Sequence, residues 1–258
     1  MKLSKFMDSA YQKKGSGRRL KTQKRDMIFS LEDLADRAGE RPDRSTVEEL
    51  VGEDRDQLEL LISADPGKRY SRLWGLLSSL AAERCKTPLS LPGRDYAGLE
   101  LSCGTIILDE AGSHVGEGMK GGRIIIQGMA GDYLGQEMEA GGIVAAGCRD
   151  YAFRNMKGGW GVVRGNAGKF AGLGNSGGRI VLQGSCKERA GWLMRSGRLF
   201  VREDAGEYLG LLMSGGEIRV KGTAGGRAGW RKKGGSIAAG AFGPEAAEDV
   251  LLLGGSLE

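Results

Sequence analysis

One serine lies in a motif that could carry nucleophilic catalysis. Gly174-Asn-Ser176-Gly-Gly178 has the Gly-x-Ser-x-Gly spacing of the esterase nucleophile elbow, in which a histidine activates the serine. The single histidine, His114, precedes the serine, whereas that class of enzyme has the order Ser, Asp, His. The two side chains must come within about 3 Å of each other to form a working pair.

Two glycine-rich strings match the dinucleotide-binding fingerprint Gly-x-Gly-x-x-Gly, and they begin at Gly116 and Gly172. That fingerprint holds a pyrophosphate only where it joins a strand to a helix within a βαβ unit. Neither string lies in such a pattern, and the repeat described below generates both. We therefore expect no nucleotide site.

Sulfur-containing side chains are the remaining candidates for metal chemistry. Cys85, Cys103, Cys148 and Cys186 lie far apart, without the spacing of zinc or iron–sulfur sites, which predicts buried free thiols. Regularly spaced methionines could offer thioethers to Cu(I), but packing in a core explains them more simply. We expect no metal or cofactor bound by this chain.

Beyond residue 100 the sequence repeats with a period of 19 residues. One column of equivalent positions, at steps of 18 or 19, contains Met119, Met138, Met156, Asn175, Met194, Met213 and Lys232. One step further back is Glu100, so about eight units fit. Within each unit a short strand alternates: Ile124 and Ile126 point inward, with Arg123 and Gln127 outward.

This unit is too short for a propeller blade or for two helices, and it favours a right-handed parallel β-helix. Stacked coils place like residues above like, about 4.8 Å apart. After each corner we expect a second buried column, formed by Val115, Leu134, Phe153, Ala171, Ala190, Leu209 and Ala228. On this fold Ser176 and His114 are about three coils apart, roughly 14 Å, which argues against the esterase pair.

Glycine marks the corners of the predicted coils, because residues 101–243 hold 36 of the 46 glycines. At these positions a Cβ would clash or φ must be positive. The recurrent glycines are Gly122, Gly128, Gly131, Gly135, Gly142, Gly147, Gly159, Gly165, Gly168, Gly172, Gly178, Gly184, Gly191, Gly206, Gly210, Gly216, Gly222, Gly225 and Gly229.

A third column of aromatic and basic residues could bind a partner or a nucleic-acid backbone, since stacking and phosphate contacts need those residue types. A plain solvated face is the competing interpretation. The column contains His114, Tyr133, Ala152, Phe170, Arg189, Tyr208 and Arg227.

The β-helix is expected over residues 93–243, preceded by an α-helical segment over 30–92 and followed by a C-terminal tail over 244–258. Apolar spacing predicts helices near 31–39, 46–63 and 70–84, with Ser30 and Ser45 in N-capping positions. Such helices could form a small bundle or an arm that docks on a partner. Nothing in them indicates catalysis.

Most of the basic character of the chain, whose formal net charge is +5, lies in a tail over residues 1–29. Residues 1–25 carry a local charge of +8, and the remainder sums to −3. The tail is expected to be flexible and could contact nucleic acid, an anionic surface or an acidic subunit. The sequence has no apolar run of about 20 residues and no signal-peptide pattern, which predicts a cytoplasmic protein without a membrane span.

The strings Gly118-Met-Lys-Gly-Gly-Arg-Ile-Ile-Ile-Gln-Gly128, Ala130-Gly-Asp-Tyr-Leu-Gly135 and Arg164-Gly-Asn-Ala-Gly168 resemble the GXGXG β-helix family. This domain is found in the β-helix subunit of formylmethanofuran dehydrogenase, in the matching subunit of the formyltransferase/hydrolase complex, and in the glutamate synthase large subunit. The resemblance covers about residues 100–240. It implies a scaffold without an active site of its own, in a complex whose pterin, metal or flavin cofactors lie on partner subunits.

The leading hypothesis is a non-catalytic structural subunit of a cytoplasmic oxidoreductase or formyl-transfer complex, most similar to the β-helix subunit of formylmethanofuran dehydrogenase. One alternative is a stand-alone domain of the glutamate synthase type. Another is an adaptor that binds through the basic tail and the aromatic and basic column. The expected partners are protein subunits.

Overall fold

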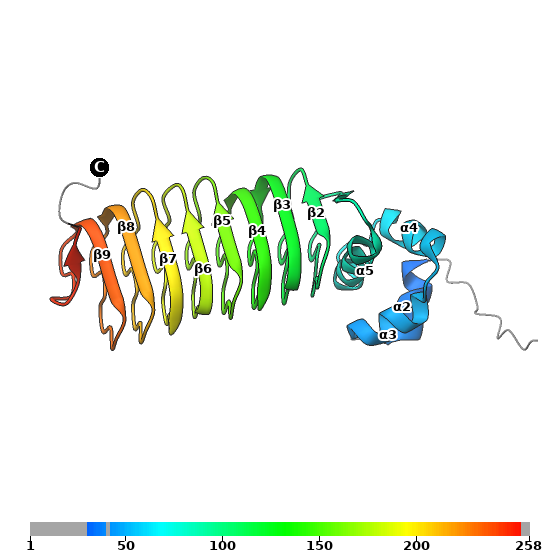
Figure 1. The fold of residues 1–258 in the computed structure, drawn as a ribbon, viewed down its shortest axis with the longest axis horizontal. Helices are drawn as coiled ribbons and strands as arrows, with labels where there is room; N and C mark the ends of the chain where they lie inside the picture. The colour runs from blue at the N-terminus through cyan, green and yellow to red at the C-terminus, as the bar shows by residue number, and fades with distance from the viewer. Residues whose placement is uncertain (1–29, 40–41, 254–258) are drawn as a thin grey trace, which may run out of the picture.

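A computed structural model describes residues 30–39 and 42–253 of the chain. The tail expected over residues 1–29 lies outside the described residues, as do the last five residues of the C-terminal tail. The described part is a parallel β-solenoid of about eight turns with helices at its N-terminal end (Figure 1). This confirms the fold class expected from the repeat.

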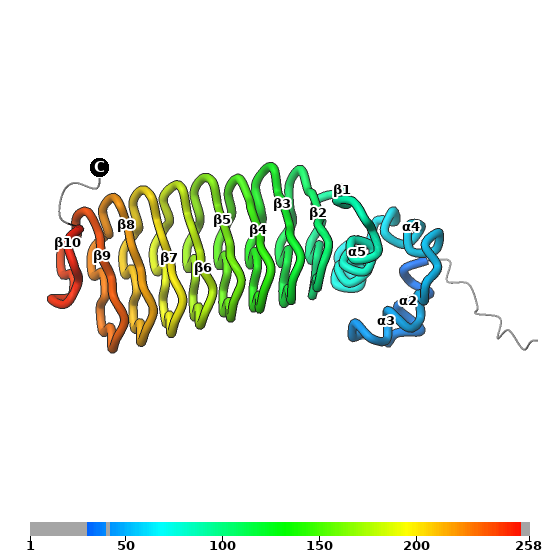
Figure 2. The backbone as a smooth tube through the Cα atoms, in the orientation of Figure 1, coloured from blue at the N-terminus to red at the C-terminus, as the bar shows by residue number. Residues whose placement is uncertain are grey.

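The described strands form a single ten-stranded parallel sheet in which each strand pairs with the next along the chain. The coils lie side by side along the rod (Figure 2). The strands are β1 (Leu89–Leu91), β2 (Thr105–Leu108), β3 (Lys120–Ala130), β4 (Ala140–Cys148), β5 (Trp160–Val163), β6 (Ser176–Leu182), β7 (Ser196–Val201), β8 (Glu217–Ala224), β9 (Ser236–Phe242) and β10 (Leu251–Leu252). The ladder therefore extends beyond residues 93–243 at both ends.

Inward columns form the core as the alternation predicts. Ile124 and Ile126 of β3 are buried, and so are Ile218 and Val220, which hold the equivalent places in β8. The methionine column is fully buried from Met119 to Met213. Its N-terminal member is Leu101 rather than Glu100, because the first step is 18 residues long and Leu101 is the buried residue.

Asn175 interrupts the methionine column with a buried polar side chain. Its Oδ1 accepts hydrogen bonds from the backbone N–H groups of Gly177 (3.2 Å) and Gly178 (2.9 Å), and its Nδ2 donates to the carbonyl of Gly178 at 2.9 Å. The amide is thus satisfied within its own turn, which is the condition for burying it without a large penalty. These bonds give Asn175 a structural role in the turn.

The recurrent glycines divide between the two physical reasons for their presence. Positive φ angles occur at Gly122, Gly135, Gly159, Gly172, Gly191, Gly210, Gly216 and Gly229. At the others an added Cβ would lie less than 3.0 Å from an atom of a neighbouring coil: Gly128, Gly131, Gly142, Gly147, Gly165, Gly168, Gly178, Gly184, Gly206, Gly222 and Gly225. Glycine therefore allows the coils to stack closely.

The N-terminal helices are α2 (Leu31–Ala38), α3 (Arg44–Val51), α4 (Arg55–Ser63) and α5 (Ser71–Arg84). The single helix expected over 46–63 is wrong, because Gly52, with φ of +58°, ends α3 and Asp54 caps α4. Ser30 caps α2 as predicted. The N-cap of α3 is Asp43 rather than Ser45, since the Asp43 carboxylate accepts the Thr46 N–H at 2.8 Å.

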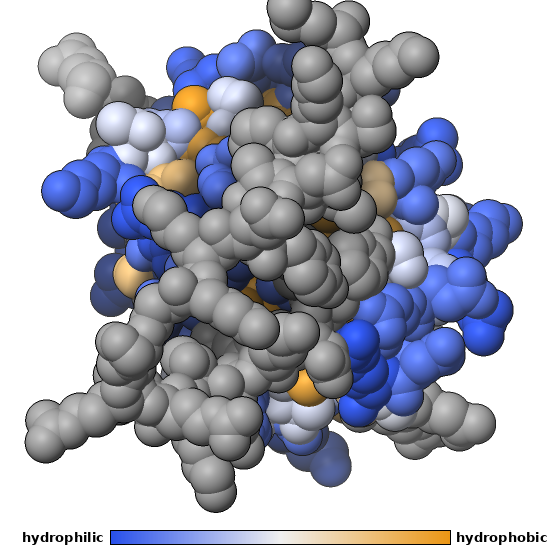
Figure 3. Space-filling view, turned by 90° about the vertical axis from the view of Figure 1, so that its right-hand side faces the viewer, coloured by the Kyte–Doolittle hydropathy of each residue, from blue (hydrophilic) through white to orange (hydrophobic). Residues whose placement is uncertain are grey.

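Helix α5 covers the first coils of the solenoid. Its Ser79 hydroxyl donates to the carbonyl of Leu99 at 2.7 Å, and the Ser78 hydroxyl accepts the N–H of Gly98 at 2.9 Å. An added Cβ on Gly75 would lie 2.5 Å from the Tyr96 carbonyl oxygen. Because terminal coils would otherwise expose core residues, these helices act as a cap, not as a free arm. From this end, the described surface is mostly hydrophilic (Figure 3).

One coil departs from the residue pattern that the other coils share, and two of its residues do not lie where the 19-residue period predicts. The residue missing from the 18-residue step lies in the turn after the strand, where the register of β3 and β4 shifts between Ile126 and Met129. Tyr151 therefore takes the outer position expected for Ala152, and Ala152 takes the buried position expected for Phe153.

Phe153 occupies instead the corner position of Gly135 and Gly172, with φ of +57°. Its ring fills the space that Gly161 leaves where the neighbouring coils have Ile143 and Ile180. An added Cβ on Gly161 would lie 2.2 Å from Cζ of Phe153. The large and small residues have exchanged places, so the core keeps its volume.

This exchange predicts strong coupling between the two positions. Phe153→Gly should lower the free energy of unfolding by about 3–5 kcal/mol through the lost ring, and Gly161→Ile should lower it by about 1–3 kcal/mol through overpacking. The double variant restores the consensus of the other coils and should be more stable than either single variant in urea denaturation. Additive losses in the double variant would contradict the compensation.

Candidate protein-docking face

The structure does not bring the candidate nucleophile and its base together. Ser176 begins β6, and its hydroxyl lies 3.4 Å from the backbone carbonyl oxygen of Met156. His114 follows β2, so β3, β4 and β5 stand between them. The Nδ1 of His114 contacts the Glu117 carboxylate at 2.6 Å. The esterase interpretation fails on this geometry.

The described residues also hold no group of three or more His, Cys, Asp or Glu side chains arranged to bind a metal ion. The prediction of four buried thiols is wrong for Cys85 and Cys103, which are exposed, and right for Cys148 and Cys186. Cys148 ends β4, and Cys186 follows β6. Burial raises the pKa of each of these two thiols to about 12.

We predict that two of the four thiols react with an alkylating reagent in the folded protein and that the other two do not. Alkylation by iodoacetamide at about pH 8 needs the thiolate, which Cys148 and Cys186 do not form because the pH lies well below their raised pKa. Mass spectrometry of the folded protein should find Cys85 and Cys103 modified, and denaturation should expose all four. Rapid modification of Cys148 in the folded state would show that its coil opens.

The aromatic column is a continuous stack of rings. Neighbouring ring centroids are 4.7–4.9 Å apart and the planes nearly parallel in the series Tyr96, His114, Tyr133, Tyr151 and Phe170. The Arg189 guanidinium continues the series between the rings of Phe170 and Tyr208, and Arg227 lies over Tyr208 and Trp230. The residues predicted for this column therefore lie together, except that Tyr151 replaces Ala152.

This stacking decides what the column can bind. Each internal ring has both faces covered by the coils above and below it, so only ring edges face the solvent. A nucleic-acid base needs an open ring face to stack on. The geometry favours a structural role for the rings along the rod and disfavours a base-binding platform.

A substitution in the stack separates the two roles. Tyr133→Ala removes two ring contacts, each worth about 0.5–1.5 kcal/mol, and should lower the free energy of unfolding by roughly 1–3 kcal/mol in denaturant. Binding of single-stranded RNA should not change. Lost RNA binding with unchanged stability would restore the binding-surface hypothesis.

The structure shows a different surface that the repeat pattern alone did not identify. In strands β2–β7 one apolar side chain points outward between the two inward ones, and register places these side chains directly above one another. All are half-buried. We call this outer column the apolar stripe; it consists of Ile107, Ile125, Val144, Val162, Val181 and Phe200.

Arginines occupy five of the ten positions that flank the apolar stripe from β3 to β7, and the other five are uncharged: Gly142 and Trp160 before the stripe, and Gln127, Ala146 and Gln183 after it. Two positions before it along the strands lie Arg123, Arg179 and Arg198, and two positions after it lie Arg164 and Arg202. These flanking columns hold no acid in those coils. The acid that follows in the next coil, Glu217 of β8, is already paired with Arg198 at 3.4 Å and Arg219 at 2.6 Å.

Much of this positive charge has no partner within the described part of the protein. Arg164, Arg179 and Arg202 form no ion pair with the described residues. A hollow of about 500 Å³ opens between β6 and β8. It is lined by Val181 and Phe200, by Arg179, Arg198 and Arg219, and by Glu217, the acid that pairs with two of these arginines. We call the apolar stripe together with its two flanking columns the β face or trough; it is hollowed between β6 and β8, and its flanking columns carry arginines and no acid from β3 to β7.

A signal for this surface was present in the sequence. Runs such as Ile124-Ile125-Ile126 and Leu199-Phe200-Val201 contain no polar residue between the inward positions. A parallel strand covered on one face alternates, whereas one covered on both faces has a continuous apolar run. The continuous runs therefore indicate a face that something covers.

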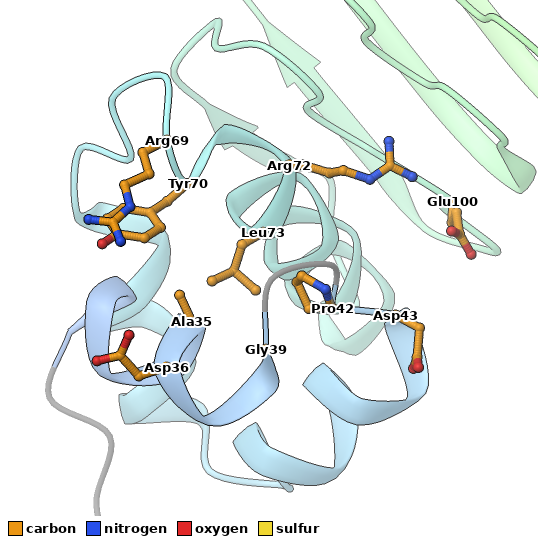
Figure 4. A pocket seen from close by; sticks show the side chains of 10 residues that line it. All are labelled: Ala35, Asp36, Gly39, Pro42, Asp43, Arg69, Tyr70, Arg72, Leu73 and Glu100. Carbon is orange, nitrogen blue, oxygen red and sulfur yellow. The ribbon is translucent and has the colours of Figure 1, made fainter.

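A larger depression, of about 820 Å³, lies between the helices and the first coils (Figure 4). Ala35 and Leu73 face each other across it, and Arg69 lies over the ring of Tyr70. Arg72 is directed away and pairs with Glu117 at 3.0 Å. The charged groups of the depression do not converge on one point, so it has no catalytic arrangement.

Comparison with models of known protein families and with curated proteins finds no match for the chain. No helix in the described ranges is both long enough and apolar enough to cross a membrane.

Proposed function

We propose that this chain is a non-catalytic structural subunit of a cytoplasmic multi-subunit oxidoreductase or formyl-transfer complex, resembling the β-helix subunit of formylmethanofuran dehydrogenase. The single observation that supports this most is the apolar stripe with its basic flanks. An outward column of Ile, Val and Phe on a rigid sheet is typical of a surface that another protein covers.

The interior of the rod supports the same proposal. Its inward positions are occupied by close-packed Ile, Leu, Val, Ala and Met side chains, so the solenoid offers surfaces and not an enclosed reaction chamber. In this proposal, pterin, metal or flavin cofactors lie on the partner subunits, as the resemblance implies. The rod would hold those subunits at fixed positions along its length.

A stand-alone domain of the glutamate synthase type remains the second candidate, because it shares the same repeat. The stacking of the rings on one another disfavours the adaptor hypothesis, because the faces of the internal rings are covered. The basic tail, which lies outside the described residues, is the part of that hypothesis left to test.

The proposal predicts a stoichiometric complex in the native host. Affinity purification of the tagged full-length chain, followed by native mass spectrometry, should recover a defined assembly with cofactor-bearing subunits. Flavin-containing synthase subunits would favour the second candidate. Recovery of the chain alone, or with nucleic acid alone, would contradict both.

A matched pair of variants tests whether the partner binds at the β face. Val181→Glu places a carboxylate in the centre of the apolar stripe and should reduce recovery of the partner roughly tenfold or more, because burying the carboxylate costs desolvation and because it would pair with arginines that the partner's acids need. Ser214→Glu adds the same charge at an exposed position away from the stripe and should leave recovery unchanged. Both variants should keep the thermal transition of the wild type, since neither side chain points into the core.

A further inference from the structure

The trough on the β face has dimensions that select one kind of occupant. Its two flanking columns are four residues apart along each strand, about 13 Å at roughly 3.3 Å per residue. An α-helix with its side chains is about 10–12 Å wide, so one helix fits between the two flanking columns. A second β-sheet would be wider than the trough.

The spacing along the rod points to the same occupant. The apolar stripe presents one side chain per coil, about every 4.8 Å, and an amphipathic helix presents one apolar side chain per turn, about every 5.4 Å. The coils from Ile107 to Phe200 extend over roughly 24 Å, which a helix of about 16 residues covers.

The positive charge of the flanking columns then indicates which residues lie on the two edges of that helix. Five arginines lie in the flanking columns between β3 and β7, where these columns hold no acid, and the exposed Asp109 is the flanking acid at β2. Three of the arginines, Arg164, Arg179 and Arg202, have no ion-pair partner among the described residues. Acidic residues on both edges of the helix would pair with them, and bidentate pairs with arginine are among the stronger polar contacts. Two copies of the same basic face would repel each other, which disfavours self-association through it.

The shape of the trough also argues against the other ligands that arginines attract. The long arginines stand beside short Val and Ile side chains, so a flat lipid surface would meet the arginines before it reached the stripe. The centre of the trough is mostly aliphatic, and the ring of Trp160 in the flanking column has the Arg123 guanidinium over it, 5.5 Å from its centroid. The bases of a nucleic acid therefore have little to stack on. A convex, narrow, apolar ridge is the complementary shape.

We propose that the β face binds one amphipathic α-helix of a partner subunit, about 16 residues long, with an apolar ridge seated on the stripe from Ile107 to Phe200 and acidic residues facing the flanking arginines. This inference rests on the proposed scaffold function and identifies the partner element that the scaffold holds. In this arrangement the helix axis lies parallel to the long axis of the rod. The arginines concerned are Arg123, Arg164, Arg179, Arg198 and Arg202.

Site-specific photocross-linking in the native host tests this assignment. The photoreactive residue p-benzoylphenylalanine replaces Val162 or Val181 in the full-length chain, and Thr223, exposed and outside the stripe, serves as the control position. After irradiation, the cross-linked peptides are sequenced by mass spectrometry. Positions 162 and 181 should capture one acidic, amphipathic segment at sites about three or four residues apart, and position 223 should not capture it.

A second measurement keeps the test independent of the cross-linker. A synthetic peptide of the captured segment should bind the purified chain, and Arg179→Glu together with Arg202→Glu should weaken its affinity roughly tenfold or more. A charge-reversed peptide, with Lys in place of its acids, should recover affinity for that double variant. Thermal melting of the variant confirms that the rod is folded.

The outcomes separate this inference from the proposed function. A stable complex whose cross-links at 162 and 181 reach a loop, a strand, a second copy of the chain, lipid or nucleic acid overturns the helix assignment and leaves the scaffold function standing. A stable complex with no cross-link at either position does the same. Absence of any complex overturns both.

Discussion

The vertical stacking of coils is the constraint on which the rest of this structure depends. Parallel strands lie about 4.8 Å apart, so each residue is confined between its equivalents in the coils above and below. That confinement produces the buried methionine column and the continuous stack of rings from Tyr96 to Phe170. It also explains why Phe153 requires glycine at position 161: volume added at one position must be removed from its neighbour.

The same constraint connects the fold to the proposed function. A column that points inward is filled by packing and has no room for a substrate, whereas a column that points outward becomes a linear surface with one side chain per coil. The apolar stripe and its partly arginine flanking columns are such surfaces, fixed in position by the strand register. A rod of this kind is suited to holding another protein at a defined place and orientation.

The features that recur in every coil could be predicted from the sequence, and those of a single irregular coil could not. Period and alternation were sufficient for the strands, the inward columns and the glycine corners. They do not show where the residue is missing in one 18-residue step, and the expected positions of Ala152 and Phe153 are therefore wrong by one residue. They also do not identify Leu101 as the first member of the methionine column. Alternation places Ile125 on the outer face with Arg123 and Gln127, but only the register between strands shows that it belongs to a continuous apolar stripe. The capping role of α5 depends on contacts between segments distant in the sequence.

Hydroxyl-radical footprinting of side chains, comparing the isolated chain with the native assembly, tests the central claim most directly. Side-chain labelling is the appropriate probe because the backbone amides of these strands are already hydrogen-bonded within the ladder. The account predicts that Ile125, Val162, Val181 and Phe200 lose reactivity in the assembly, while the exposed Met129 and Trp230, which lie outside the stripe, keep theirs. Unchanged labelling of the apolar stripe in an intact assembly would contradict it.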